Sequence, residues 1–510
     1  MGRSKGGARR GGGRSPRAFR GVLLALGLLG STARGAEPAR PPDALDLLGN
    51  TGCEERTTRP AEALGLLGDP GCEETTRPAD APLKEDAVAK DTPTTRHLWR
   101  ALAEVTAVNL VVWTYDRVVG KEWARVDVHT WKDNLRTGFV WDGDGFPENQ
   151  IAHPYHGSFY FTAARDNGFS FVGALPFTLL GSLQWELFAE NLPPSFNDLI
   201  NTTLGGAAMG EALYRLSSLV LDPEATGGRR FVRELGAGVL SPVRGFNRVL
   251  RGDVSRREPK PPSWTPGTLA SWGTLGYLKL GDGESLAWGE DQFFAEFSLR
   301  YGDAFQGEHH RPFDAFEARI QFTTQESNLV SHARLQGLLV AKPLVRTERD
   351  ELRLGVLQQM SYVDTLAYEM GGQALNVGLL YRHQLTDRST LKTMLLADGV
   401  PLAAISSEHS SGASRRYDYG VGGGFQVQAV YARDTWDVVT LEAGVSHTLV
   451  LDGSNGSHQV RTGQLQVDLP VYRRLGLGGE ANFYQRHSRF NAFPDVRKDT
   501  YQLRVFISVH

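Results

Sequence analysis

The second half of the chain alternates between hydrophobic and polar residues with a period of two. Between residues 269 and 510, clear examples are the segments 293–301, 375–382, 439–448 and 501–510. Successive side chains of a β-strand point to opposite faces, so the pattern predicts strands with one apolar and one polar face. Clusters of Gly, Asp, Asn and Ser separate about eleven to thirteen such segments, as turns do between strands.

This pattern is typical of a transmembrane β-barrel, in which lipid-facing and lumen-facing residues alternate. A soluble exported β-sandwich also alternates, but these segments are long for a sandwich, and the chain ends on a strand. We therefore predict a transmembrane antiparallel barrel of about twelve strands within residues 265–510. His510 stands where outer-membrane barrels usually carry an aromatic residue. Outer-membrane lipid and the barrel insertion machinery are the expected partners.

The start of the chain has the layout of an export signal. Residues 1–20 contain seven basic and no acidic residues, and an apolar run and small residues follow. We predict a signal peptide over 1–36, cleaved near Ala33 or Ala36, because the run is too short to span a membrane. The protein is then expected in the outer membrane of a Gram-negative bacterium.

Residues 37–95 predict a disordered linker, since they are rich in Pro, Glu, Asp, Thr and Ala and lack aromatic residues. The linker contains a duplication with Cys53 and Cys72 at equivalent places. These cysteines either form a disulfide after export or are only part of a duplicated spacer.

Residues 96–250 predict a helical unit. Apolar residues at helical spacing indicate a helix over 97–119, and two further helices over 171–191 and 195–219. The third contains Gly206-x-x-x-Gly210, which lets a neighbouring helix approach closely. We expect the helix pair 171–219 to lie inside or beneath the barrel, because its polar stripes need partners and each helix has a length of roughly 30 Å.

Several side chains of this unit are candidates for chemistry. Ser182, Glu186 and Glu190 share one face of an otherwise apolar helix, either as a polar site inside a bundle or barrel or as a solvated or salt-bridged stripe. His153 and His156 lie three residues apart and could act as acid–base groups or hold a turn. A catalytic set would use one of these histidines as base, Glu186 or Glu190 as orienting group and Ser158 or Ser182 as nucleophile.

A metal site is the other chemical possibility. His153, His156 and Glu186 carry ligand atoms of the kind that Zn²⁺ prefers. Asp142 and Asp144 resemble the start of a calcium loop, but the expected later acidic ligands are missing. The sequence indicates no cofactor, and the glycine-rich segment 420–424 lacks the Lys-Ser/Thr of a phosphate-binding loop.

The third predicted helix, 195–219, carries polar residues on two different faces. Ser195 and Asp198 have the spacing of a capping box at its start, and Asp198 and Asn201 belong to a polar stripe. Glu211 and Arg215 are four residues apart and are expected to form an ion pair on another face.

These motifs together resemble an exported bacterial family, the domain of unknown function 3943, over roughly residues 135–250. The matching runs are His153-Pro-x-x-Gly157-x-x-Tyr160-x-x-Ala163-Ala-Arg165, Gly181-Ser182-x-x-Trp185-Glu186-x-x-x-Glu190, Pro194-Ser195-x-Asn197-Asp198 and Gly210-Glu211-x-x-x-Arg215. The resemblance implies a Gram-negative envelope protein. It implies no activity, so it assigns no catalytic role to these residues.

Composition narrows the function classes. With 55 Lys and Arg against 58 Asp and Glu, the net charge of −3 argues against a nucleic-acid partner. A mean hydropathy of −0.30 argues against a multi-helix inner-membrane protein. We therefore expect a barrel with a structural or ligand-transport role in the envelope, closed by the helical element. The alternative is a lipid-modifying hydrolase or acyltransferase with its site in the helical unit.

Overall fold

The computed structural model describes residues 95–282, 288–324, 328–410 and 416–510. The predicted signal peptide, the predicted linker up to residue 94 and the possible pairing of Cys53 with Cys72 lie outside the described residues.

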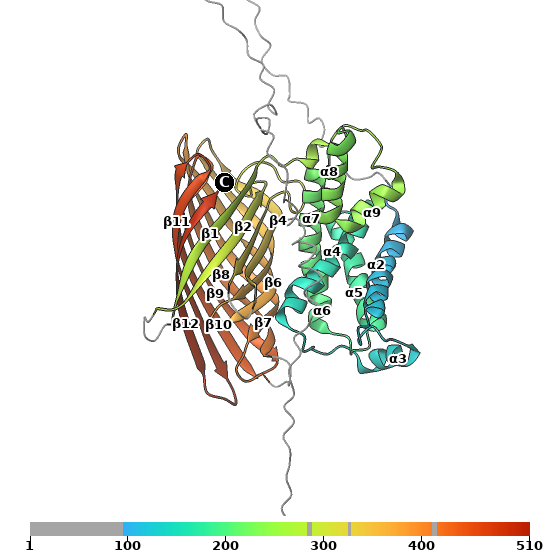
Figure 1. Cartoon of the computed structure of the whole chain (residues 1–510). Coiled ribbons are helices and arrows are strands. Elements are labelled where there is room, and N and C mark those ends of the chain that lie inside the picture. The colour runs from blue at the N-terminus through green and yellow to red at the C-terminus, as the bar shows by residue number, and fades with distance from the viewer. Residues whose placement is uncertain (1–94, 283–287, 325–327, 411–415) are drawn as a thin grey trace, which may run out of the picture. The chain divides into compact units, whose positions relative to one another are not determined.

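The C-terminal part is a closed antiparallel barrel (Figure 1). Each strand pairs with its neighbours in sequence, and Gly273 of the first strand pairs with Val509 of the last, which closes the ring. This confirms the predicted barrel of about twelve strands. The strands are β1 (Leu269–Asp282), β2 (Trp288–Tyr301), β3 (Phe316–Thr323), β4 (Val330–Arg346), β5 (Asp350–Asp364), β6 (Glu369–Thr386), β7 (Ser389–Ser406), β8 (Tyr417–Arg433), β9 (Trp436–Asp452), β10 (Gly456–Tyr472), β11 (Leu475–Phe490) and β12 (Val496–Val509).

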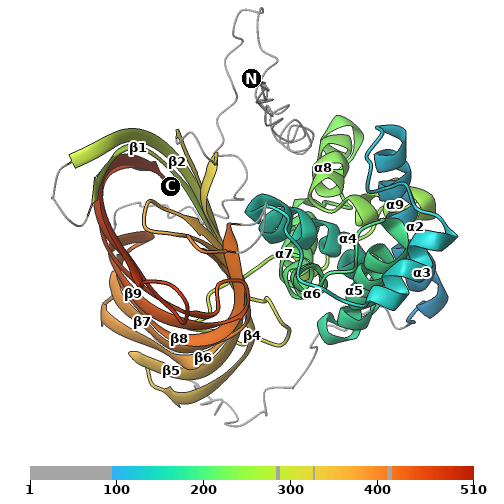
Figure 2. The same cartoon turned by 90° about the horizontal axis from the view of Figure 1, so that it is seen from below.

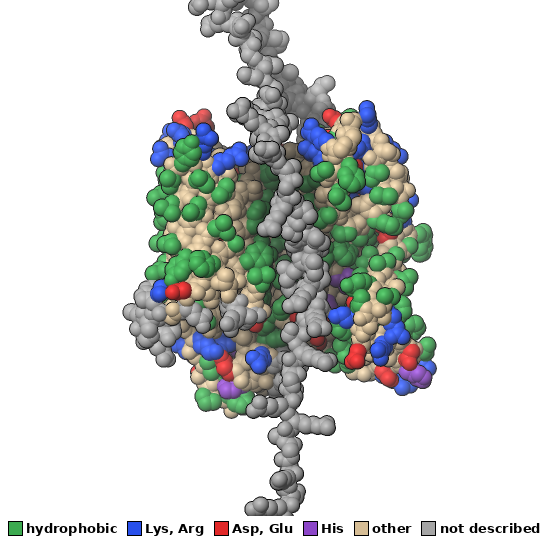
Figure 3. All heavy atoms as spheres, viewed as in Figure 1, with side chains coloured by type: hydrophobic (Ala, Val, Ile, Leu, Met, Phe, Trp, Pro, Cys, Tyr) green, Lys and Arg blue, Asp and Glu red, His purple; other side chains and the backbone are tan. Residues whose placement is uncertain are grey.

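The alternation of β12 shows how the sequence sets the two faces of the barrel. Leu503, Val505 and Ile507 are 46%, 60% and 56% exposed, whereas Arg504 and Phe506 between them are 5% and 3% exposed. Apolar side chains therefore cover the outside, and Arg504 and other polar side chains point into the lumen. Figure 3 shows hydrophobic side chains along the visible wall and charged ones gathered towards its two ends. This is the surface of a barrel that faces lipid.

The N-terminal part is helical. Its elements are α2 (Leu98–Val118), α3 (Val128–Thr137), η1 (Glu148–Ala152), α4 (His153–Asp166), α5 (Phe171–Gln184), η2 (Trp185–Ala189), α6 (Phe196–Ile200), η3 (Asn201–Gly205), α7 (Gly206–Val220), α8 (Gly227–Leu240) and α9 (Pro242–Arg251), followed by the short η4 (Pro262–Trp264). The three helices predicted from sequence are present, but π-helical turns interrupt the second and third. Among the described residues, the stretch Phe171–Ala189 is long and apolar enough to cross a membrane, and 44% of that window is buried within the fold.

The helices pack against the outer face of the barrel wall. Tyr301, Phe316 and Leu335 have the strand positions of outward-facing residues, yet they are buried in one apolar cluster with helical residues. Phe313 of the β2–β3 loop stacks on Phe171 of α5 with ring centres 5.6 Å apart. Figure 2 shows the helices outside the ring of strands.

The expected position of the helix pair 171–219, inside or beneath the barrel, is therefore wrong. Its polar stripe does find partners on the barrel, but they lie on the outer wall. Gln358 of β5 donates to the Leu204 carbonyl at 2.7 Å, and Gln373 of β6 donates to Asn201 at 3.3 Å. Inward-facing strand side chains line the lumen and the cavity in it.

Glycines set the spacing between α4 and η3–α7. A Cβ atom on Gly157 would lie 2.0 Å from the carbonyl oxygen of Thr202, and one on Gly206 would lie 2.6 Å from the backbone of Gly157. The two backbones are therefore in direct contact, as the small-residue pattern predicts. This contact brings the first turn of α4 against η3, where the candidate site lies.

Candidate functional site

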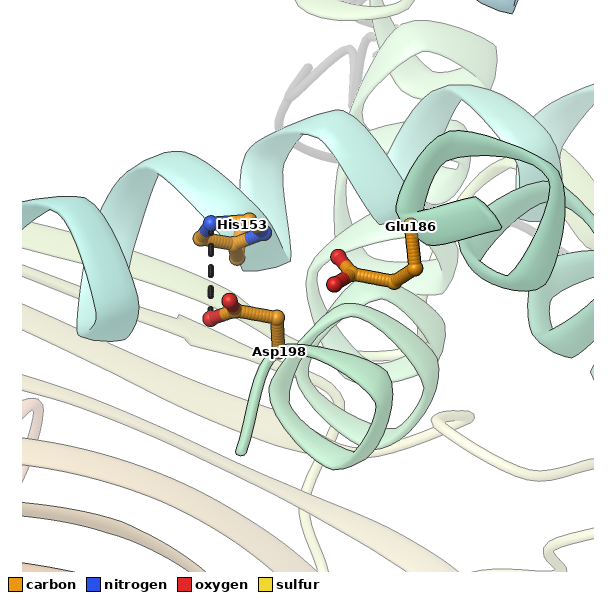
Figure 4. Close-up of side chains that lie close together, drawn as sticks. All are labelled: His153, Glu186 and Asp198. Carbon is orange, nitrogen blue, oxygen red and sulfur yellow. Dashed lines mark ion pairs between the residues drawn. The ribbon is translucent and has the colours of Figure 1, made fainter. Parts of the chain in front are cut away.

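A cluster of buried polar side chains lies where α4, η2 and α6 meet (Figure 4). It joins His153 from the first turn of α4, Glu186 from η2 and Asp198 from α6. One nitrogen or oxygen atom from each side chain lies within 4.8 Å of the other two. Glu186 and Asp198 are 1% and 3% exposed, so the predicted alternative of a solvated stripe is wrong for Glu186.

Neighbouring hydrogen bonds fix the position of His153. Its Nε2 atom lies 3.4 Å from Oδ1 of Asp198, and its Nδ1 atom lies 3.2 Å from the Thr202 hydroxyl. Both ring nitrogens thus have polar neighbours, and the ring plane is held between them. A ring held in this way can present Nε2 to a ligand while Nδ1 keeps its hydrogen bond.

Glu186 is held by the start of the following helix. Its Oε2 atom accepts a hydrogen bond from the Ser195 backbone amide at 2.8 Å. The Ser195 hydroxyl accepts from the Asp198 amide at 3.2 Å, as the predicted capping box requires. The reciprocal half of the capping box differs, because Glu186 takes the Ser195 amide. The Asp198 side chain is thereby left to face His153.

A second layer connects this cluster to the barrel. Asn197 donates to Oδ1 of Asp142 at 2.8 Å, and Asn149 donates to the Tyr417 and Tyr419 hydroxyls at 3.1 and 3.0 Å. The Tyr419 hydroxyl in turn donates to Asp142 at 2.9 Å. The outer wall of β8 therefore helps to orient the carboxylates of the helical unit.

Burial shifts the ionisation of these groups. It lowers the pKa of His153 to about 4, against a smaller opposite effect of Asp142. Burial, together with Asp142 and Glu186, raises the pKa of Asp198 well above its usual value. Burial and the neighbouring Glu186 raise that of Glu190 in the same way. Burial therefore favours the uncharged forms of His153, Asp198 and Glu190.

The other candidate catalytic residues do not join this cluster. His156 has other partners: its Nε2 atom lies 2.9 Å from the Tyr160 hydroxyl, and its ring packs against Trp185. The Ser158 hydroxyl donates to the Tyr155 carbonyl at 2.6 Å. Ser182 Oγ is buried without a hydrogen-bond partner among the described residues. In that part of the chain, no hydrogen bond joins either serine to a candidate histidine, so the predicted serine–histidine arrangement is not formed.

Arg165, Glu211 and Arg215 form a separate ion-pair group with a structural role. Glu211 is 1% exposed and accepts from Arg165 at 2.7 Å and from Arg215 at 3.0 Å. Arg215 also reaches Asp314 in the β2–β3 loop at 2.8 Å. The predicted i, i+4 pair is present, and it connects α7 to the barrel.

The barrel lumen contains a second candidate site. A cavity of about 240 Å³ is lined by strand residues that include Arg319, Arg334, Asp398 and Glu442. Two charged pairs cross the lumen: Arg300 of β2 to Asp437 of β9 at 2.8 Å, and Arg334 of β4 to Glu442 of β9 at 3.3 Å. Arg504 of β12 and Glu480 of the adjacent β11 form a further buried pair at 2.9 Å. The lumen is therefore narrow and charged.

Comparison with known families confirms the resemblance seen in the sequence. Residues 138–243 match the family described as a domain of unknown function (DUF3943). The match contains the helical cluster and stops before the barrel. None of the curated proteins matches the chain.

Solved structures with similar architecture are bacterial outer-membrane barrels. The NanC porin has 9% identity and a TM-score of 0.25, and the match covers 46% of this chain and 99% of that chain. The outer membrane channel DcaP of Acinetobacter baumannii has 8% identity and a TM-score of 0.20, covering 47% and 96%. The beta domain of the Bordetella autotransporter Brka has 13% identity and a TM-score of 0.22, covering 48% and 99%.

Sequence reasoning missed part of the helical site. The sequence pattern indicates Asp142 only as a calcium-loop residue and Asp198 only as part of a cap and a polar stripe, and it does not indicate Asn149 or Tyr419. Asn149 and Tyr419 are 270 residues apart, so no local pattern connects them. The local signals of buried acidic groups are the Asp-Gly-Asp run at 142–144 and the two glutamates, Glu186 and Glu190, on an otherwise apolar helix.

Proposed function

We propose that the protein is an outer-membrane barrel, exported by a cleaved signal peptide, that binds and passes a small polar solute. The charged pairs that cross the lumen are the observation that carries this proposal. They narrow the channel without filling it, since the cavity of about 240 Å³ remains beside them. Closure by strand side chains replaces the closure by helices that the sequence suggested.

The lining of the cavity indicates the chemistry of the solute. Arg319 and Arg334 supply positive charge, and Asp398 and Glu442 supply negative charge. Gln359, Gln426 and Gln428 add uncharged donors and acceptors. Such a mixture favours a solute with both hydrogen-bonding groups and separated charge over a simple anion or cation.

The second function class, an enzyme that modifies envelope lipid, has less support. A serine hydrolase or acyltransferase needs a nucleophile within hydrogen-bond distance of its base. In the described part of the helical unit, Ser158 bonds to its own helix and the histidines bond to other groups. We therefore retain solute passage as the proposed function.

Conductance measurements test this proposal. The mature protein would first be tested for heat-modifiable gel migration and then reconstituted in planar bilayers. We expect small single-channel steps for the wild type and several-fold larger steps for Arg334→Ala, because this change removes one side of a cross-lumen pair. Arg388→Ala is the matched control, since Arg388 pairs with Asp434 at 2.8 Å but is 69% exposed in a turn.

Three results of these measurements would contradict different parts of the proposal. A heat-modifiable protein that gives no conductance as wild type or as Arg334→Ala would contradict solute passage and leave a structural role. Equal conductance of Arg334→Ala, Arg388→Ala and wild type would show that the cross-lumen pair does not limit passage. A protein without heat-modifiable migration would contradict the outer-membrane barrel itself.

A further inference from the structure

We propose that His153, Glu186 and Asp198 bind a divalent transition-metal cation, of which Zn²⁺ and Mn²⁺ are the best candidates. The site would lie in the helical unit and is independent of solute passage through the barrel. Ligand geometry, the orientation of His153 and the charge of the cluster all favour a bound cation.

The ligand geometry fits a small cation. Two ligands that each lie about 2.0–2.1 Å from a tetrahedral Zn²⁺ are about 3.3–3.4 Å apart. His153 Nε2 and Asp198 Oδ1 are 3.4 Å apart, and the Glu186 carboxylate points towards the same space (Figure 4). The three ligand atoms lie within 4.8 Å of one another, so a small movement of one carboxylate completes the site.

The surroundings of His153 resemble those of a metal ligand. A ligating histidine commonly uses its second ring nitrogen to donate to a fixed acceptor. Here Nδ1 can donate to the Thr202 hydroxyl, and Nε2 then presents a lone pair to Asp198. A nitrogen lone pair and a carboxylate oxygen repel each other unless a cation, or a proton on the carboxyl group, lies between them. Binding of a metal would therefore displace that proton.

The cluster of His153, Glu186 and Asp198 differs in its charge balance from Glu211, another buried carboxylate of the helical unit. Glu211, on the same helical unit, is neutralised by Arg165 and Arg215. Among the described residues, Glu186 and Asp198 contact His153, the neutral groups of Ser195 and Asn197, and the carboxyl groups of Glu190 and Asp142, respectively, but no Arg or Lys side chain. Buried carboxylates without a basic partner are costly unless they are protonated or coordinate a metal.

The ligand types select the class of metal. A ligand set of one imidazole and two carboxylates suits Zn²⁺ or Mn²⁺ better than Ca²⁺, which takes oxygen ligands only. Three protein ligands also leave coordination positions for water, which is the arrangement of a reactive rather than a closed structural site.

Metal titration of the full mature chain tests this inference. After chelation, protein in detergent would be titrated with Zn²⁺ by calorimetry, with Ca²⁺ for comparison. We expect one Zn²⁺ per chain and weak or no Ca²⁺ binding. His153→Gln and Asp198→Asn should each lower Zn²⁺ affinity at least about 100-fold, and Thr202→Val about 10–100-fold, as for loss of a group that orients a ligand.

His156→Gln is the matched control, because His156 is a histidine of the same helix that bonds to Tyr160 instead. Its Zn²⁺ affinity should equal that of the wild type. Failure of the wild type to bind Zn²⁺ or Mn²⁺ would overturn the proposal, as would equal affinities of the His153→Gln and His156→Gln proteins. Heat-modifiable migration and far-UV circular dichroism report whether barrel and helices are folded.

Pulsed electron paramagnetic resonance of Mn²⁺ bound to the wild type gives a test that needs no variant. Modulation from an imidazole nitrogen is expected if His153 is a ligand. Bound Mn²⁺ with oxygen ligands only would contradict the assignment. Conductance should be unchanged by chelation, so failure of the metal site and failure of solute passage can be distinguished.

Discussion

Arg300 of β2 and Asp437 of β9 meet across the lumen with Nη2 and Oδ2 2.8 Å apart. Four strands, β1, β12, β11 and β10, lie between them on the shorter path around the ring. Only closure of the barrel brings these two side chains together. The contact therefore reports on the closed ring as well as on the width of the lumen.

A double-mutant cycle on this pair should give a measurable coupling. We expect Arg300→Ala and Asp437→Ala to interact by about 0.5–3 kcal/mol in the free energy of unfolding, because the two side chains share a direct contact. The exposed Arg388–Asp434 pair has the same 2.8 Å separation and should couple far more weakly. Equal coupling energies of the two pairs would contradict the expectation that burial in the lumen strengthens the Arg300–Asp437 interaction. Unfolding in urea, followed by gel migration, supplies the measurement.

Glu211 should be essential for stability of the helical unit. Glu211→Gln leaves the buried Arg165 without its carboxylate and Arg215 with Asp314 alone, so we expect a loss of about 3–5 kcal/mol in the free energy of unfolding. Denaturation followed by far-UV circular dichroism measures this loss. Glu258→Gln is the control, since Glu258 is 63% exposed in its pair with Arg256. A similar effect of both changes would show that burial of Glu211 does not matter.

The contact between α4 and η3–α7 should not tolerate a methyl group. A Cβ on Gly157 would lie 2.0 Å from the Thr202 carbonyl oxygen. Gly157→Ala is therefore expected to destabilise the fold by about 1–3 kcal/mol, as other overpacked sites do. Gly228→Ala meets no atom within 4 Å and serves as the control for a helical glycine. Thermal unfolding of the two variants in the same detergent makes the comparison, and Gly157→Ala with wild-type stability would contradict the close packing.

The stability of the metal-free protein should depend on pH through its buried carboxyl groups. The pKa values of Asp198 and Glu190 are raised in the folded state, above ordinary values of 3.8 and 4.5, chiefly by burial. The folded state then binds more protons than the unfolded state above these values, so stability falls as pH rises from about 4. Asp198→Asn should reduce this slope. Thermal unfolding across pH in the presence of chelator measures it, and identical slopes for wild type and variant would contradict the shift.

Metal binding should oppose part of this pH dependence of the protein's stability. A bound cation favours the ionised carboxylates, so added Zn²⁺ is expected to stabilise the wild type more at neutral than at acidic pH. Thermal unfolding with and without Zn²⁺ at both pH values measures the difference. His153→Gln should lose the Zn²⁺ effect and His156→Gln should keep it.

The sequence by itself determined the features that depend on neighbours along the chain. The alternation of Leu503 and Arg504 defines the two faces of β12, because successive side chains of a strand point in opposite directions. The pair Glu211–Arg215 follows from helical spacing in the same way. Strand identity, barrel closure and three helices could therefore be predicted.

Tertiary structure decided everything that depends on distant partners. Tyr301 has the pattern of a lipid-facing residue, but it is 2% exposed because the helices cover it. Asp198 has the spacing of a capping-box residue that accepts from the Ser195 backbone amide. In the structure Glu186 accepts from that amide instead, and the Asp198 side chain faces His153. Periodicity predicts which way a side chain points, but only the packing of the whole chain determines which residues it contacts.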